Sequence, residues 1–200
     1  MYHINNMSKE IVFDIETIGD IRNMQSMKLT VISIYEYEHD AYRSFEESEL
    51  GELWPILERS ERLIGFNSAH FDIPILNRYY AGDLTTLPHL DMLKVVKESS
   101  GSRFKLNDLA KATLQIEKSA DGLQAMEWFK EGKIDLIKQY CEQDVKVTKE
   151  LYDYGRKNRM IYYPTLTGDL MPIAVNFDPS VVQPGTSPQL GGGINLTLPL

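Results

Sequence analysis

The stretch that decides the fold is IVFDIET, at residues 11–17. Its β-branched and aromatic residues predict a strand over Glu10–Ile15. Side chains two positions apart on a strand share one face, so Asp14 and Glu16 lie on the same face, roughly 7 Å apart along it. Carboxylates on such an apolar strand are costly to bury without cations, and their oxygens suit Mg²⁺ or Mn²⁺. The alternative is that the strand ends here and both acids point into solvent.

The sequence after this stretch predicts an α/β architecture. Strands at Leu29–Tyr37 and Ala41–Phe45 follow across polar turns, which indicates an antiparallel meander of three strands. Strand and helix then alternate, and three helical segments close the pattern. These elements are expected at Leu50–Arg59, Leu63–Phe66, Phe71–Tyr80, Pro88–Leu93, Leu106–Leu114, Leu123–Lys130 and Ile134–Tyr154. Their order predicts a five-stranded mixed sheet flanked by helices, which several layer topologies satisfy.

The helix expected at Ile134–Tyr154 is the clearest of these elements. Its apolar residues recur at three- and four-residue spacing, and Gly132 and Gly155 are expected to mark its ends. Tyr140 and Asp144 are four residues apart on this helix and therefore share one face. Beside the apolar stripe, the pair can look toward the sheet. The alternative is an ordinary tyrosine and aspartate on the surface.

A third polar group lies where a strand gives way to a helix, in GFNSAHFD at residues 65–72. Strand ends are where the sites of α/β proteins gather, and Asp72 falls in the first turn of the next helix. Stabilisation of the helix dipole explains an acid at that position equally well. We interpret Asp91 as a helix cap and His70 as structural, and we leave both outside the site.

In this order, the three groups resemble the three exonuclease motifs of the DEDD superfamily. They are Asp-x-Glu on the first strand, Asn-x-x-x-Phe-Asp at a strand–helix junction and Tyr-x-x-x-Asp on the closing helix. The tyrosine is typical of the DEDDy branch, because the histidine branch has His five positions before the last Asp, where this chain has Gln139. The branch includes proofreading domains of family A and B DNA polymerases. The chain looks most similar to stand-alone polymerase-B-like exonucleases, from about Ile11 to Tyr154.

The resemblance implies a ribonuclease H-like fold and a two-metal 3′–5′ exonuclease that releases nucleoside 5′-monophosphates from single-stranded DNA or RNA. Two Mg²⁺ or Mn²⁺ ions are expected on Asp14, Glu16, Asp72 and Asp144, with Tyr140 as the fifth catalytic residue. A phenol with a pKa near 10 is a poor base at neutral pH, so Tyr140 is expected to orient the attacking water. The substrate-binding residues are expected to be Thr17, Asn67, Phe71, Lys105 and Lys118.

Two other functions stay open at this point. One is a catalytically silent module that binds nucleic acid or serves as a scaffold, and the other is an endonuclease of the ribonuclease H type. The net charge of −8 argues against a generic nucleic-acid binder, but the charge is unevenly distributed. Glu36–Glu61 holds nine acids and two basic residues, whereas Lys94–Lys118 holds six basic residues and three acids. The basic segment is expected either to meet phosphate or to be an ordinary solvated surface.

The 200 residues, 42% of them hydrophobic, suffice for one domain. We expect an N-terminal extension over residues 1–9, the exonuclease domain over 10–160 and a C-terminal extension over 161–200. That extension is expected to hold a strand near Met171–Phe177 and a flexible Pro/Gly-rich tail over Pro179–Gly193. The lone Cys141 excludes an internal disulfide, and no apolar run predicts a membrane span or signal peptide. We therefore expect a cytoplasmic protein, with a replication, repair or RNA-processing protein as its partner.

Overall fold

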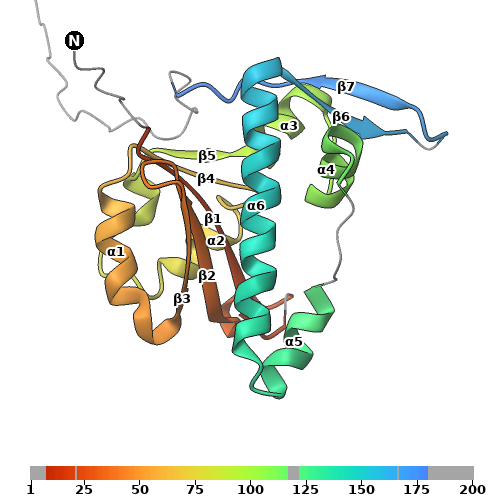
Figure 1. The fold of residues 1–200 in the computed structure, drawn as a ribbon. Coiled ribbons are helices and arrows are strands. Elements are labelled where there is room, and N and C mark those ends of the chain that lie inside the picture. Colours follow the sequence, from red (N-terminus) through yellow and green to blue (C-terminus); the bar gives the residue numbers. More distant parts are fainter. Residues whose placement is uncertain (1–7, 21, 117–121, 166, 180–200) are drawn as a thin grey trace, which may run out of the picture.

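A five-stranded sheet forms the centre of the structure, a computed structural model that describes residues 8–20, 22–116, 122–165 and 167–179 (Figure 1). The strands follow the order β3-β2-β1-β4-β5. Their bounds are β1 (Glu10–Ile18), β2 (Lys28–Glu36), β3 (Ala41–Glu46), β4 (Arg62–Gly65) and β5 (His89–Asp91). The first three pair antiparallel as a meander, whereas β4 pairs parallel with both β1 and β5. The predicted mixed sheet is confirmed.

Helices connect the later strands and close the sheet. They are α1 (Leu50–Glu58), α2 (Asp72–Leu76), α3 (Met92–Ser100), α4 (Leu106–Leu114), α5 (Gly122–Lys130) and α6 (Ile134–Asn158), with short 3-10 helices at Met24–Ser26, Glu47–Glu49 and Leu84–Thr86. The expected helix Phe71–Tyr80 was too long. Beyond Leu76 the chain turns, and the Asn77 side chain holds the next loop by accepting from the Leu84 N–H (2.8 Å) and donating to Asp83 (3.1 Å).

The expected strand Pro88–Leu93 also ends early, at Asp91. The Asp91 carboxylate accepts hydrogen bonds from the backbone N–H groups of Leu93 (3.0 Å) and Lys94 (3.4 Å). These bonds satisfy donors that the first turn of a helix leaves unpaired, so α3 begins directly after this residue. The interpretation of Asp91 as a helix cap is confirmed.

An apolar core covers each face of the sheet. On one face, Ile11, Phe13 and Ile15 of β1 pack with α1 and α2, and on the other Val12 packs with α3, α4 and α6. Figure 1 shows α1 and α6 on opposite sides of the sheet. The division follows from the two-residue period of a strand. Residues of β1 that are an even number of positions from Val12 therefore face α6.

Gly155 does not end the long helix, as the sequence suggested, because α6 continues to Asn158. The helix ends at Arg159, which adopts the left-handed conformation with φ 58°. At Gly155 a Cβ atom would collide with the ring of Phe177, which is fully buried. Close packing of a later segment, and not helix termination, therefore explains this glycine.

A buried ionic cluster ties the ends of the described chain to the sheet. Glu10 and Arg62 are 2% and 6% exposed and pair through Arg62 Nε, 2.9 Å from the Glu10 carboxylate. Arg62 also donates to the Tyr152 hydroxyl (2.6 Å) and to the carbonyl oxygens of Phe177 (2.9 Å) and Asp178 (3.1 Å). A buried ion pair needs such additional hydrogen bonds to offset its desolvation. The cluster joins β1, β4, α6 and the segment near residue 178.

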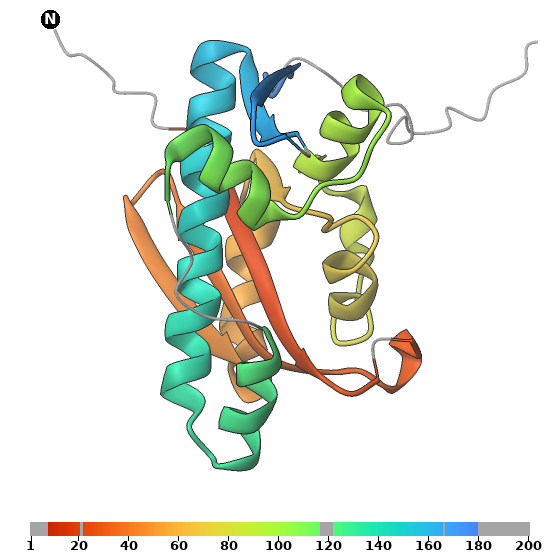
Figure 2. The same cartoon turned by 90° about the vertical axis from the view of Figure 1, so that its right-hand side faces the viewer.

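Two further strands, β6 (Met160–Pro164) and β7 (Leu170–Ala174), form an antiparallel hairpin beside α4 (Figure 2). The strand expected at Met171–Phe177 exists over slightly different bounds, but its partner β6 was missed. The hairpin is joined to α4 by hydrogen bonds between Thr113 Oγ1 and the Tyr162 backbone. The expected flexible tail lies, after Pro179, outside the described residues. Within the described ranges, no helix combines the length and apolar composition needed to cross a membrane.

Candidate metal centre

Three carboxylates from two distant parts of the chain meet on the α6 face of the sheet. One oxygen from each of Asp14, Glu16 and Asp144 lies within 4.8 Å of the others. Asp144 is only 8% exposed, and Asp14 and Glu16 are half-buried. Like charges this close repel one another in a partly desolvated place, so the arrangement suits a cation. We refer to these three residues as the acidic trio.

The first strand presents its two carboxylates toward α6 because Asp14 and Glu16 continue the alternation of Val12. Asp14 pairs with Ser33 across the β1–β2 ladder, and the register shifts between Glu16 and Thr17. At this bulge, Thr30 donates its hydroxyl to the carbonyl oxygen of Glu16 (2.9 Å). Bulges are common beside active sites, where they alter the direction of a side chain.

A thiol holds α6 against the same strand. Cys141 Sγ donates to the carbonyl oxygen of Asp14 (3.2 Å), and the residue is fully buried with Val31 and Ile137. Burial raises the pKa of the Cys141 thiol, and the negative charges of Asp14 and Glu16 raise it further. The thiol therefore stays protonated and keeps its role as a donor.

Tyr140 lies one helical turn before Asp144 on α6 and is 8% exposed. Its ring meets that of Trp128 of α5 nearly edge-on, with centroids 6.1 Å apart and an interplanar angle of 67°. Edge-to-face packing of this kind fixes the orientation of a ring. Trp128 was not among the expected site residues. Its only signal in the sequence is a large aromatic side chain on the helix before the Tyr-x-x-x-Asp motif.

Asp72 is 3% exposed and does not belong to the acidic trio, but it contacts the same strand. Burial raises its pKa to about 7, and the negative charge of Asp91 adds to this, while hydrogen bonds from its own backbone N–H and that of Ile15 act in the opposite direction. The Ile15 N–H belongs to the residue between Asp14 and Glu16. The parallel pairing of β1 with β4 stops at Val12, which leaves this edge of β1 open to Asp72.

Asp91 organises the loop that carries Asp72. Besides capping α3, its carboxylate accepts from the backbone N–H groups of Asn67 (2.9 Å) and Ala69 (3.1 Å). Asn67 adopts a left-handed conformation with φ 62°, and Gly65 leaves room for the Ser68 side chain, which a Cβ atom would strike. The sequence suggested only the cap. The second role depends on the parallel pairing of β4 with β5, which brings Gly65 beside Asp91.

The expected substrate-binding residues are divided among different surroundings. Asn67 and exposed Lys105 line one cavity of about 510 Å³, and the Asn67 side chain accepts from Arg103 (2.8 Å). Thr17 is half-buried on β1, just beyond the bulge. Phe71 packs against the core on the α1 face, so its ring is not in that cavity. Lys118 lies outside the described residues. His70, interpreted as structural, is exposed.

A family model described as the RNase H superfamily matches residues 11–155. The chain belongs to that superfamily. The match extends from the first strand to the end of the Tyr-x-x-x-Asp helix, so it includes every residue of the acidic trio as well as Asp72 and Tyr140. The hairpin β6–β7 follows the matched range. No curated protein matches the sequence.

Two solved structures share the fold of this RNase H superfamily member. The family B DNA polymerase from the hyperthermophilic archaeon Pyrobaculum calidifontis superposes with a TM-score of 0.59 at 14% identity, over 73% of this chain and 24% of that chain. Trypanosoma brucei RNase D in complex with RNA U12 superposes with a TM-score of 0.56 at 14% identity, over 74% of this chain and 55% of that chain. The chain thus spans less than two thirds of either protein. At this identity the likeness shows the fold alone.

Proposed function

We propose that this RNase H superfamily member is a metal-dependent 3′–5′ exonuclease of the DEDDy type, which removes nucleoside 5′-monophosphates from the 3′ end of single-stranded nucleic acid. The observation that carries the proposal is the meeting of Asp14, Glu16 and Asp144 within 4.8 Å. The order of the three motifs along the chain supports it. So do Asp72 beside the same strand and Tyr140 one turn from Asp144.

The residues present fit a divalent cation. The trio offers only carboxylate oxygens, which are the ligands that Mg²⁺ and Mn²⁺ prefer. Because the sheet face around them is apolar, water does little to screen the repulsion between the three carboxylates. Asp14, Glu16 and Asp144 would hold one ion, and Asp72 would serve a second. A raised pKa near 7 fits that role, because a nearby cation favours the ionised form of Asp72. Bound ions would supply positive charge to the attacking and leaving oxygens of a phosphodiester.

The protein's own side chains position the reactants. We assign Tyr140 to orient the attacking water through its hydroxyl, with Trp128 holding the ring from the side. Free phenols have pKa values near 10 and are poor bases at neutral pH, so we assign Tyr140 to orientation and not to proton removal. Asn67 and Lys105, which line the same cavity, would hold the substrate strand.

The decisive experiment follows the fate of 5′-labelled single- and double-stranded DNA and RNA with Mg²⁺, Mn²⁺ or a chelator. Both sugars are needed, because one structural neighbour is a DNA polymerase and the other was solved with RNA. We expect a ladder of single-nucleotide losses that requires metal and disappears in Asp144→Ala. The matched control is Glu142→Ala, which removes an exposed carboxylate from the same helix. Internal cuts would favour an endonuclease, and metal binding without cleavage would favour a scaffold.

A further inference from the structure

We propose that a groove lined by the loop after β4, by α3 and by the loop before α4, with the β6–β7 hairpin beside it, binds single-stranded nucleic acid upstream of the reacting 3′ end. This inference rests on the proposed function and extends it to the nucleotides that are not cleaved. Two adjoining cavities of about 280 and 510 Å³ form the groove, and both are lined by Asn67, Leu93 and Arg103. We refer to them together as the upstream groove.

The charge of the upstream groove suits a phosphate backbone. Its lining includes four cationic side chains, those of Lys94, Lys97, Arg103 and Lys105. Two acids also line it, Asp91 and Asp108, but the Asp91 carboxylate is 6% exposed and already accepts from four backbone N–H groups. In a chain of net charge −8, this local excess of positive charge is the feature expected of a phosphate-binding surface.

The aromatic side chains of the groove suit bases. Phe66 and Phe104 line the larger cavity. The centroid of the Phe104 ring lies 4.7 Å from that of the Tyr163 ring on β6. Tyr163 pairs with Met171 across the hairpin, so both point to the same face, and Met171 is 45% exposed. Unpaired bases stack on such rings without regard to sequence. The groove thus combines cations with stacking surfaces.

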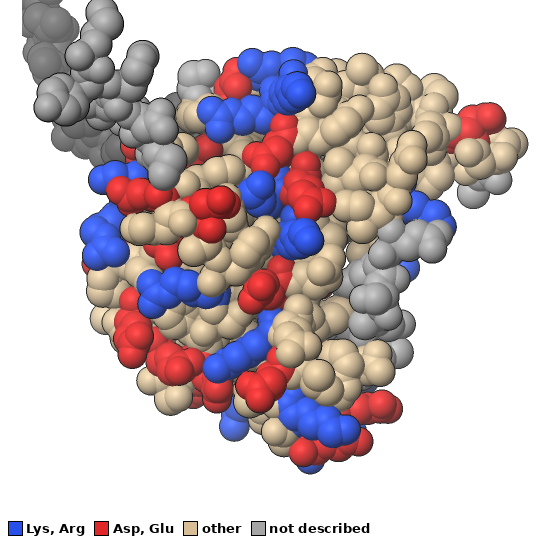
Figure 3. All heavy atoms as spheres, in the orientation of Figure 1, with Lys and Arg blue, Asp and Glu red and all other residues tan. Residues whose placement is uncertain are grey.

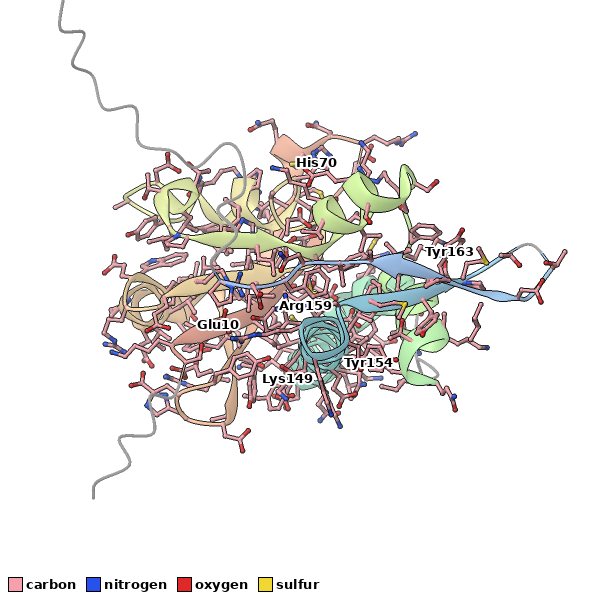
Figure 4. All side chains as sticks on the ribbon, turned by 90° about the horizontal axis from the view of Figure 1, so that it is seen from above. Glu10, His70, Lys149, Tyr154, Arg159 and Tyr163 are labelled. Atoms are coloured by element: carbon pink, nitrogen blue, oxygen red, sulfur yellow. The ribbon has the colours of Figure 1, made fainter. Side chains whose placement is uncertain are left out.

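The hairpin contacts the groove through Tyr163 and projects away from the sheet (Figure 4). Figure 4, viewed from above with α6 end-on, shows it projecting to one side with Tyr163 along it. The surface over β6, β7 and the neighbouring α4 carries few charged side chains in Figure 3, whereas α6 carries both signs along its length. Leu170, near the tip, is 52% exposed. The hairpin also follows the range matched by the family model.

One loop connects the upstream groove to the acidic trio. Asn67 lines both cavities at the start of that loop, and Asp72, at its end, accepts from the backbone of Ile15 between Asp14 and Glu16. A strand whose 3′ end lies at the trio therefore passes Asn67 as it enters the groove. The phosphates of the nucleic acid would then contact Lys97 and Arg103, and its bases would stack near Phe104.

The test measures equilibrium binding of labelled oligonucleotides of about 3 and about 12 nucleotides by fluorescence anisotropy, with chelator present so that no cleavage occurs. The variants are Lys97→Glu with Arg103→Glu, and separately Phe104→Leu, which keeps an apolar side chain for packing. The control is Arg59→Glu, an exposed charge next to α1 on the far side of the sheet. Thermal melting confirms that each variant is folded.

We expect the double charge reversal to weaken binding of the longer oligonucleotide by at least about 10-fold and to lower its salt dependence by about 0.7 in slope for each phosphate that the variant no longer neutralises. Phe104→Leu is expected to weaken it by about 5-fold or more. Binding of the shorter oligonucleotide should change much less. If both folded variants bind the longer oligonucleotide with wild-type affinity, the proposal that the upstream groove binds nucleic acid is wrong, even if the enzyme degrades DNA or RNA. Length-dependent binding without any nuclease activity would instead refute the proposed function and leave the groove standing.

Discussion

The thiol of Cys141 donates a hydrogen bond to the backbone carbonyl oxygen of Asp14, across 3.2 Å. This contact joins α6 to β1 at the residue where the acidic trio begins, and it uses no carboxylate oxygen. Because Asp144 lies only three residues after Cys141 on α6, the distance between the helix and the strand sets the distance between the carboxylates. Packing at a small apolar residue thus controls the geometry of the charged site.

Enlarging this residue should impair the site. We expect Cys141→Leu to force α6 away from β1, to cost about 1–3 kcal/mol of stability through overpacking and to lower kcat by at least about 10-fold. Cys141→Ser, which is similar in size and keeps a donor, should retain most of the activity. Urea unfolding and single-turnover cleavage measure the two effects. Full activity in a folded Cys141→Leu protein would show that the helix position is not critical.

Asp91 should matter for catalysis although it lies outside the acidic trio. Asp91→Ala removes the acceptor for the N–H groups of Asn67 and Ala69, so the loop that carries Asp72 loses its anchor. We expect a loss of about 1–3 kcal/mol in stability and a fall of about 10–100-fold in activity or metal affinity. Asp83→Ala is the matched control, because Asp83 is exposed and caps a short 3-10 helix by accepting from the Thr85 N–H. A normal metal affinity and kcat in Asp91→Ala would contradict this positioning role.

The sequence predicted the sheet well because its signals are local. The two-residue alternation around Asp14 predicted that Asp14 and Glu16 share one face of β1, and in the structure their carboxylates come together. The spacing of Tyr140 and Asp144 likewise placed them on one face of a long helix, where both are buried. Such periodicities follow from backbone geometry alone, whatever the rest of the fold.

Features that depend on contacts between distant segments could not be predicted in this way. Gly155 was interpreted as the end of a helix, since nothing nearby announces that Phe177 packs against it. The strand β6 was missed because it is short and exposed at its Pro164 end, and its pairing with β7 is what makes it a strand. Trp128 beside Tyr140 is of the same kind, because only the packing of α5 on α6 brings the two rings together.

Tyr140→Phe should separate orientation from acid–base chemistry. The variant keeps the ring that packs against Trp128 and removes only the hydroxyl, so we expect the stability to change by less than about 1 kcal/mol. If the hydroxyl orients the attacking water, kcat should fall by about 10–100-fold while KM stays nearly constant. Steady-state kinetics on a 5′-labelled strand measure both values. A loss as large as that of Asp144→Ala would contradict a role limited to orientation.

Metal ions should stabilise the folded protein through the acidic trio. At a concentration of about 100 times the dissociation constant, an ion that binds only the folded state adds about 2.7 kcal/mol, so Mg²⁺ or Mn²⁺ should raise Tm by several degrees. Asp144→Asn removes a charge from the trio and should abolish most of this rise, while its Tm without metal stays equal or increases. Glu142→Gln, on the same helix, should respond like the wild type. Differential scanning calorimetry with each ion and with chelator makes the comparison.

His89 should make stability depend on pH in a window that the carboxylate site does not explain. Burial lowers its pKa from 6.5 to about 4. The negative charge of Asp91 raises this pKa and the positive charge of Lys94 lowers it, and both effects are smaller than that of burial. The ring lies beside Phe13, and its Nε2 is 2.9 Å from Ser68 Oγ. A neutral imidazole is therefore part of the packing beneath the loop that carries Asp72.

The sign of the effect follows from proton counting. Between pH 6.5 and about 4 the unfolded chain binds a proton at His89 that the folded protein does not, so the free energy of unfolding falls as the pH falls through this window, by up to about 3 kcal/mol. His89→Gln keeps a hydrogen-bonding group for Ser68 but does not titrate, so its stability should fall less over the same range. Urea unfolding at pH 7, 6, 5 and 4.5 gives the difference between the two proteins. Parallel curves for the wild type and His89→Gln would show that His89 is protonated equally in the folded and unfolded states, and the packing around a neutral ring would have to be rejected.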